Sequence, residues 1–196
     1  MALRFWAMTC QFTLRKSDKA AILAALSRYP HHYDESFCES ADRIATNGYA
    51  TKLDIGGLAA WKRIRCETPW VTKLQSLPQT TVTTATRKAF LPGLTPARRL
   101  ETLRSDLKHG MGGAFALGSA LLTAWNQTEF AVTDRRTRAA LRSLLRPVGC
   151  ACDFGYYPTY VEHVAEIRNQ MTTARGDEVL SSRDIDKALY VLLPSG

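Results

Sequence analysis

Residues 95–138 read TPARRLETLRSDLKHGMGGAFALGSALLTAWNQTEFAVTDRRTR, and they carry the strongest local signals in the chain. Thr95 is followed by Pro96, which is the pattern of a helix cap and a proline in the first helical turn. Leucines then recur at helical spacing as far as Leu107. The stretch therefore opens with a predicted helix.

A glycine cluster separates this helix from a second one, which is predicted over about 114–125 and is built from Ala, Leu and Gly. Glycines let the backbone turn tightly and approach a phosphate closely. The free N–H groups and the dipole at the start of the second helix favour an anion. The residues of this hairpin that we expect to contact phosphate are Lys108, His109, Gly110, Met111, Gly112 and Gly113.

An arginine-rich helix is predicted further along, over 135–145. The residues Phe130-Ala131-Val132-Thr133 form a short extended piece, and Asp134 is well placed to cap the helix that follows. Cations in the first turns of a helix oppose its dipole, so Arg135, Arg136 and Arg138 are interpreted as phosphate contacts. The alternative is a plain solvated surface.

The rest of the chain reads as helices joined by loops. Gly48 ends one predicted helix, Thr51 or Asp54 begins the next, and two prolines make 67–80 a loop with a short helix at most. The other helices are predicted over about 17–29, 32–46, 80–90, 158–174 and 182–193. The sequence predicts an all-α fold, a two-lobed helical bundle within a single domain of residues 1–196.

Basic residues are concentrated in one part of the chain. The 196 residues carry a net charge of +8, and residues 87–146 alone hold 11 basic and four acidic residues, which is +7 of that total. A concentrated positive field indicates a polyanion partner, usually nucleic acid. The alternative is a solvated helix surface that happens to be rich in arginine.

Several classes of protein are disfavoured by composition. No apolar run approaches the roughly 20 residues of a membrane helix, and the first residues lack the apolar block of a secretory signal. The five cysteines are odd in number and scattered, as expected for reduced thiols in the cytoplasm. Cys150-x-Cys152 matches no common metal spacing, and His31-His32 and His163 show no metal spacing with Asp or Glu, so no metal is predicted.

The order of hairpin, small-residue helix, short apolar run and aspartate resembles the helix-hairpin-helix DNA glycosylase superfamily, which includes endonuclease III, the adenine glycosylases and the alkyladenine glycosylases. Gly110-Met111-Gly112 matches the G-V-G of its hairpin, residues 113–122 match the next helix, and Asp134 matches its aspartate. The resemblance covers about 95–146, under a third of the chain. It implies a monomeric enzyme that flips a modified base from double-stranded DNA and hydrolyses its N-glycosidic bond, with Asp134 as the catalytic carboxylate.

Three departures from the family pattern refine this expectation. Lys108-His109 stands where the family usually has Leu-Pro. Ala114 stands where bifunctional members carry a lysine, which implies a monofunctional glycosylase without strong lyase activity. No cysteine follows Cys152, so the four-cysteine cluster of endonuclease III relatives is absent and no cofactor is expected.

Four residues are candidates for a base pocket. Ala114 and Gly118 share a helix face that looks toward the base in resembling glycosylases, and two small residues leave room for an enlarged base. Hypermodified bacteriophage DNA carries such bases, which would give the protein a role in antiviral defence; the alternative is close helix packing. Tyr33 and Trp61 are candidates for stacking on the flipped base, although aromatic residues more often belong to a core.

Other functions also fit the sequence. Asp134 can serve only as an N-cap, in which case the chain is a non-catalytic DNA-binding protein that keeps the hairpin. A small helical interaction protein with an incidental basic surface is a further alternative.

Overall fold

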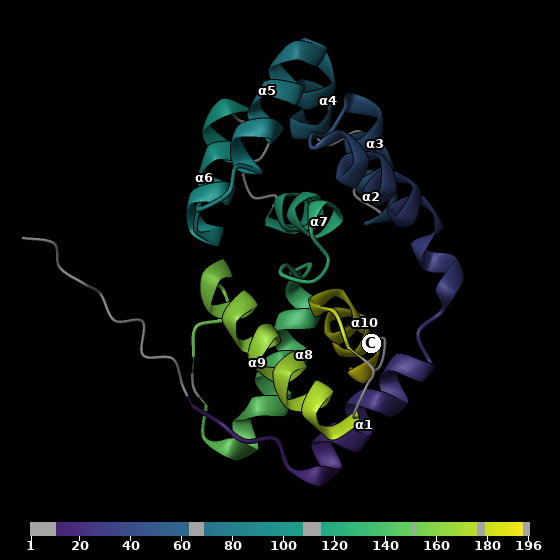
Figure 1. The fold of residues 1–196 in the computed structure, drawn as a ribbon, viewed down its shortest axis with the longest axis vertical. Helices are drawn as coiled ribbons and strands as arrows, with labels where there is room; N and C mark the ends of the chain where they lie inside the picture. The colour runs from purple at the N-terminus through teal and green to yellow at the C-terminus, as the bar shows by residue number, and fades with distance from the viewer. Residues whose placement is uncertain (1–10, 63–68, 108–114, 151, 176–178, 194–196) are drawn as a thin grey trace, which may run out of the picture. The chain divides into compact units, whose positions relative to one another are not determined.

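The computed structural model describes residues 11–62, 69–107, 115–150, 152–175 and 179–193 (Figure 1). These residues form ten α-helices and two short 3-10 helices, and no β-strand occurs among them. The all-α class predicted from the sequence is confirmed. None of the described helices is both long enough and apolar enough to cross a membrane.

Among the described residues, short segments connect the helices. The helices are α1 (Lys16–Ser27), η1 (His31–Asp34), α2 (Glu35–Asn47), α3 (Lys52–Trp61), α4 (Pro69–Ser76), α5 (Gln79–Ala89), α6 (Pro96–Asp106), α7 (Phe115–Trp125), α8 (Arg135–Leu145), η3 (Arg146–Val148), α9 (Tyr157–Arg175) and α10 (Ser182–Leu192).

The chain divides into two compact units. Unit 1 consists of residues 1–29 and 135–196, and unit 2 consists of residues 30–134. The chain therefore passes from unit 1 to unit 2 after Tyr29, and it returns to unit 1 directly after Asp134.

Unit 2 is built around α7, whose sequence FALGSALLTAW carries no charge. Helix α7 packs against α2, α3 and α6 (Figure 1). The side chains of Leu117, Leu121 and Leu122 are fully buried. A helix that is apolar on all sides is stable only when other helices surround it. The small-residue helix predicted from the sequence is therefore the centre of this unit.

Local signals set the junction between α2 and α3. Gly48 ends α2 with φ +70° and donates its N–H to the Ile44 carbonyl at 2.9 Å. Thr51 and Asp54 form a capping box at the start of α3, with Thr51 N donating to Asp54 Oδ2 at 2.8 Å. Arg43 Nε also donates to Asp54, at 2.6 Å, which ties the two helices together. The predicted helix boundaries at Gly48 and Thr51 are confirmed.

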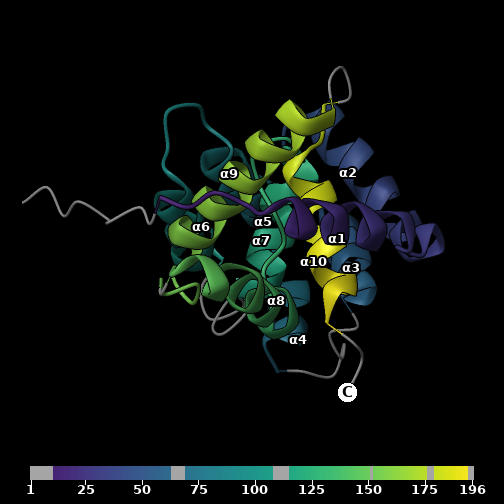
Figure 2. The same ribbon diagram turned by 90° about the horizontal axis from the view of Figure 1, so that it is seen from below.

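Unit 1 is built around α10, which packs against α1, α8 and α9 (Figure 2). Its N-terminus carries a capping box, with Ser181 N donating to Asp184 Oδ2 at 2.9 Å. Arg183 is buried, forms an ion pair with Asp186, and donates to the Tyr29 hydroxyl at 3.1 Å. This network joins α10 to the end of α1.

Arg99 belongs to the basic stretch of the sequence, but it is a core residue and contributes nothing to a surface. Only 3% of it is exposed, and its Nη1 donates to the carbonyls of Ala89 and Leu91 at 2.7 and 2.8 Å. Its guanidinium lies 4.6 Å from the centre of the Trp125 ring. Burial lowers the pKa of Arg99 because removal from water disfavours the charge.

We expect Arg99→Met to lower the free energy of unfolding by about 2–3 kcal/mol, since it leaves the buried carbonyls of Ala89 and Leu91 without their donor. Urea denaturation measures this loss. Arg98→Met is the matched control, because Arg98 is exposed on the same helix, and its effect should stay within about 0.5 kcal/mol. Equal effects of the two substitutions would contradict the core role of Arg99.

Candidate functional site

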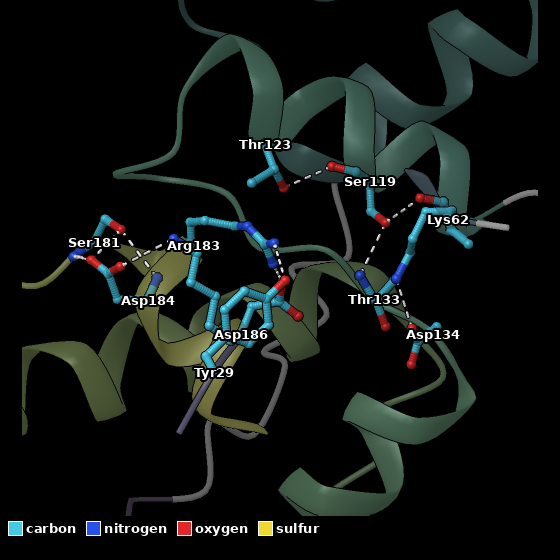
Figure 3. A network of polar contacts seen from close by, with 12 residues as sticks. Tyr29, Lys62, Ser119, Thr123, Thr133, Asp134, Ser181, Arg183, Asp184 and Asp186 are labelled. Atoms are coloured by element: carbon cyan, nitrogen blue, oxygen red, sulfur yellow. Dashed lines mark hydrogen bonds and ion pairs between the residues drawn. The ribbon is translucent and has the colours of Figure 1, made fainter. Parts of the chain in front are cut away.

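Asp134 forms an ion pair with Lys62, from a helix far away in the sequence. Lys62 Nζ lies 2.7 Å from Asp134 Oδ2 (Figure 3). The two side chains are 12% exposed for Lys62 and 24% exposed for Asp134. Both residues belong to unit 2, and the carboxylate keeps partial access to solvent. A charged, partly exposed carboxylate with a fixed partner can orient or deprotonate a water molecule.

Lys62 is positioned by the end of α3. It caps this helix at its C-terminus, where its backbone N–H donates to the Leu58 carbonyl at 3.0 Å. Its ammonium lies 5.1 Å from the centre of the Trp61 ring, and that ring in turn lies 4.8 Å from the Phe37 ring. Aromatic side chains therefore support the lysine beside its carboxylate partner.

The segment before Asp134 is buried and held against α7. Thr133 N donates to Ser119 Oγ at 3.0 Å, and Ser119 Oγ donates to the Ala116 carbonyl at 3.0 Å (Figure 3). Thr123 Oγ1 donates to the Ser119 carbonyl at 2.8 Å. Because Ser119 binds the residue directly before Asp134, α7 sets the position of that carboxylate. This short segment has no helix or strand of its own to do so.

Two of the predicted base-pocket residues adjoin these groups. Trp61 is half-buried and neighbours Lys62, and Gly118 is buried in α7 directly before Ser119. Tyr33 lies in η1, is 38% exposed, and packs edge-on against His32 with 4.6 Å between ring centres.

The predicted hairpin lies outside the described residues. This applies to Lys108, His109, Gly110, Met111, Gly112 and Gly113, and to Ala114 of the predicted base pocket.

Helix α8 carries an arginine stripe, which consists of Arg135, Arg138 and Arg142 of α8 and Arg146 of η3. These positions are three or four residues apart and so share one face, opposite the buried Thr137 and Leu141. Three of them are exposed, and Arg138 is half-buried close to Gly155.

Arg136 differs from the arginine stripe. Its guanidinium lies 4.4 Å from the centre of the Tyr190 ring, and its Nη2 donates to the Leu193 carbonyl at 2.6 Å. It therefore attaches α8 to α10 within unit 1, as a structural contact.

Lys62 is the site residue that sequence reasoning missed. Its partner Asp134 is 72 residues away, and a lysine at the end of an ordinary amphipathic helix carries no local signal of a special role. The neighbouring Trp61 is the one feature of the sequence that points to Lys62.

Comparisons with models of protein families, with curated proteins and with solved structures find no match to this chain.

A double-mutant cycle measures the energetic link between Lys62 and Asp134. We expect Lys62→Met, Asp134→Asn and the double variant to give a coupling free energy of about 1–2 kcal/mol in urea denaturation, because the pair is largely removed from water. The pair Lys88–Asp106, at 2.9 Å, is the matched control and should give about 0.5 kcal/mol or less, because its lysine is 57% exposed. A coupling free energy as small as that of the control pair would contradict the role of Lys62 in fixing the Asp134 carboxylate.

Proposed function

We propose that this protein is a DNA N-glycosylase in which Asp134 is the catalytic carboxylate. The observation that carries the proposal is the ion pair of Asp134 with Lys62, made by a carboxylate whose preceding residue is tethered to α7. An aspartate needed only as a helix cap requires no such support from a second helix. The resemblance of residues 95–146 to helix-hairpin-helix glycosylases supplies the reaction class.

The reaction breaks the bond between C1′ of the deoxyribose and the base nitrogen. The sugar becomes cation-like as the base leaves, and a negative carboxylate stabilises this charge. A water molecule then bonds to C1′ and gives up a proton, for which the Asp134 carboxylate is the acceptor. The products are a free base, which takes up a proton, and an abasic site in an intact strand.

Lys62 is a positioning residue in this proposal. Its ammonium holds the Asp134 carboxylate in one orientation and neutralises part of its charge. A protonated amine is not a nucleophile, so a lysine held in this ion pair is not expected to attack the sugar. We therefore propose a monofunctional enzyme.

Double-stranded DNA is the proposed partner, and phosphate contacts supply most of the affinity. The arginine stripe of α8 begins at the residue directly after Asp134, and no acidic residue occurs over 135–146. Side chains of this kind contact the DNA backbone without reading sequence. The glycines of the predicted hairpin, Gly110 and Gly112, would contact a second stretch of backbone.

The first test measures base release from duplexes that each contain one defined base: uracil, 3-methyladenine, 8-oxoguanine or a glucosylated hydroxymethylcytosine. Mass spectrometry of the released bases identifies the substrate. We expect Asp134→Asn to lower the release rate by about 10²-fold or more, with duplex affinity largely kept, because the amide preserves shape but cannot take the proton. Asp106→Asn is the matched control and should release the base at the wild-type rate.

Wild-type turnover by Asp134→Asn would contradict the assignment of the catalytic residue. Binding of duplex DNA without release of any base in the panel would favour the non-catalytic alternative. The strand should stay intact until alkali is added. A borohydride-trapped adduct that disappears in Lys62→Met would instead make the enzyme bifunctional through this lysine.

The arginine stripe has its own test in the salt dependence of duplex binding. We expect Arg142→Ala and Arg146→Ala each to lower the slope of log K against log salt by about 1, and to weaken binding to all sequences alike. Arg28→Ala is the control, because Arg28 is an exposed arginine at the C-terminal cap of α1, and its Nε donates to the Ala24 carbonyl of that helix. Salt-insensitive binding would contradict the DNA interface.

A further inference from the structure

Two cysteines lie side by side in the loop between η3 and α9. Gly149 ends η3 with φ +77°, a conformation that favours glycine, and Cys150 N then donates to the Leu145 carbonyl at 3.2 Å. The chain turns so that Cys150 Sγ and Cys152 Sγ are 3.4 Å apart. This distance is too long for a disulfide bond, so the two sulfurs meet as thiols.

His163 completes a cluster of three metal-ligating groups. It lies in α9, and its Nε2 is 3.4 Å from Cys150 Sγ. The two sulfurs and the imidazole nitrogen all lie within 4.8 Å of one another. Helix α9 thus brings a histidine to the cysteine loop from 13 residues further along the chain.

The orientation of the imidazole suits a ligand at Nε2. His163 Nδ1 lies 2.7 Å from the Thr159 carbonyl, which can only accept a hydrogen bond, so Nδ1 carries the proton. In the neutral ring Nε2 then presents its lone pair toward the thiols. Metal-binding histidines in proteins are commonly held by such a hydrogen bond from the second nitrogen to a carbonyl.

The three groups are also largely shielded from solvent. Cys150 is 4% exposed and His163 is 3% exposed, while Cys152 is half-buried. The His163 ring stacks on Phe12 with 5.7 Å between centres and meets Phe154 edge-on at 5.2 Å. These aromatic contacts fix the ring, so a metal would not have to order a mobile side chain.

We propose that Cys150, Cys152 and His163 bind a zinc ion. In a tetrahedral site with Zn–S of about 2.3 Å and Zn–N of about 2.0 Å, two sulfurs lie about 3.8 Å apart and a sulfur and a nitrogen about 3.5 Å apart. The two 3.4 Å separations that involve Cys150 need a small expansion to admit the ion. The third pair, Cys152 Sγ and His163 Nε2, lies within 4.8 Å and has to come to about 3.5 Å. Two thiolates with an imidazole are a donor set that selects zinc over magnesium or calcium.

The ion would stabilise unit 1. The proposed zinc site is independent of the proposed catalytic site, since all three ligands lie in unit 1 and Asp134 lies in unit 2. Binding replaces the thiol protons by the metal and links the loop after η3 to α9 through bonds stronger than a thiol–imidazole hydrogen bond. Three protein ligands leave the fourth position to water. The expectation from sequence spacing that these residues hold no metal is thus revised.

The test uses the full chain, purified without chelator, with metal content measured by elemental analysis. We expect one zinc per chain, and a thiolate-to-metal charge-transfer band when cobalt(II) replaces zinc. Cys152→Ser and His163→Gln should each lose the metal, with at least tenfold weaker affinity. Cys38→Ser is the matched control, because Cys38 is an exposed thiol of α2, and it should keep one zinc.

Stability gives an independent readout. A chelator should lower the Tm of the wild-type protein by about 5 °C or more and leave that of Cys152→Ser unchanged. Cys152 is half-buried, so this variant keeps the test valid if substitution of buried Cys150 prevents folding. Substoichiometric metal in the wild type, or equal metal in Cys152→Ser, would overturn the proposal and leave only a hydrogen bond between thiol and imidazole.

Discussion

The hydrogen bond from Thr133 N to Ser119 Oγ is the constraint on which the candidate site depends. Residues 130–133 are buried without belonging to a helix, so their backbone groups need partners from elsewhere. Ser119 meets this need because α7 is the central helix of unit 2 and cannot shift without moving α2, α3 and α6. Asp134 follows at once, and its carboxylate therefore lies beside Lys62, which caps the C-terminus of α3. A rigid core helix thus determines where the charged group stands.

Positive charge serves three different purposes in this chain. Arg99 is a core residue that satisfies two carbonyls, and Lys62 is a partly buried partner of one carboxylate. The arginine stripe of α8 is mostly exposed and carries the charge that a phosphate backbone could meet. The net charge of +8 therefore overstates the number of side chains available for direct contact with a polyanion, since a buried cation cannot touch a phosphate.

Each unit organises its polar chemistry around its own central helix. In unit 2, α7 anchors the segment that leads to Asp134. In unit 1, α10 carries Arg183, and the end of α10 binds Arg136 of α8. Helix α9 brings His163 to the two cysteines of the preceding loop. The proposed zinc ion would strengthen unit 1, whose core is shared between the two ends of the chain. Stability and the proposed catalysis can therefore be tested separately.

Local signals in the sequence determined the helices and their ends: Gly48 and Thr51 could be read directly, because caps act within a few residues. The all-α class, the small-residue helix and the prominence of Asp134 were likewise visible in the order of residues 95–138. Only the tertiary structure decided that Lys62 partners Asp134, that Arg99 is buried, and that His163 meets Cys150 and Cys152. These contacts join residues on different elements, and whether two such side chains meet depends on helix packing, which a spacing pattern along the chain does not contain.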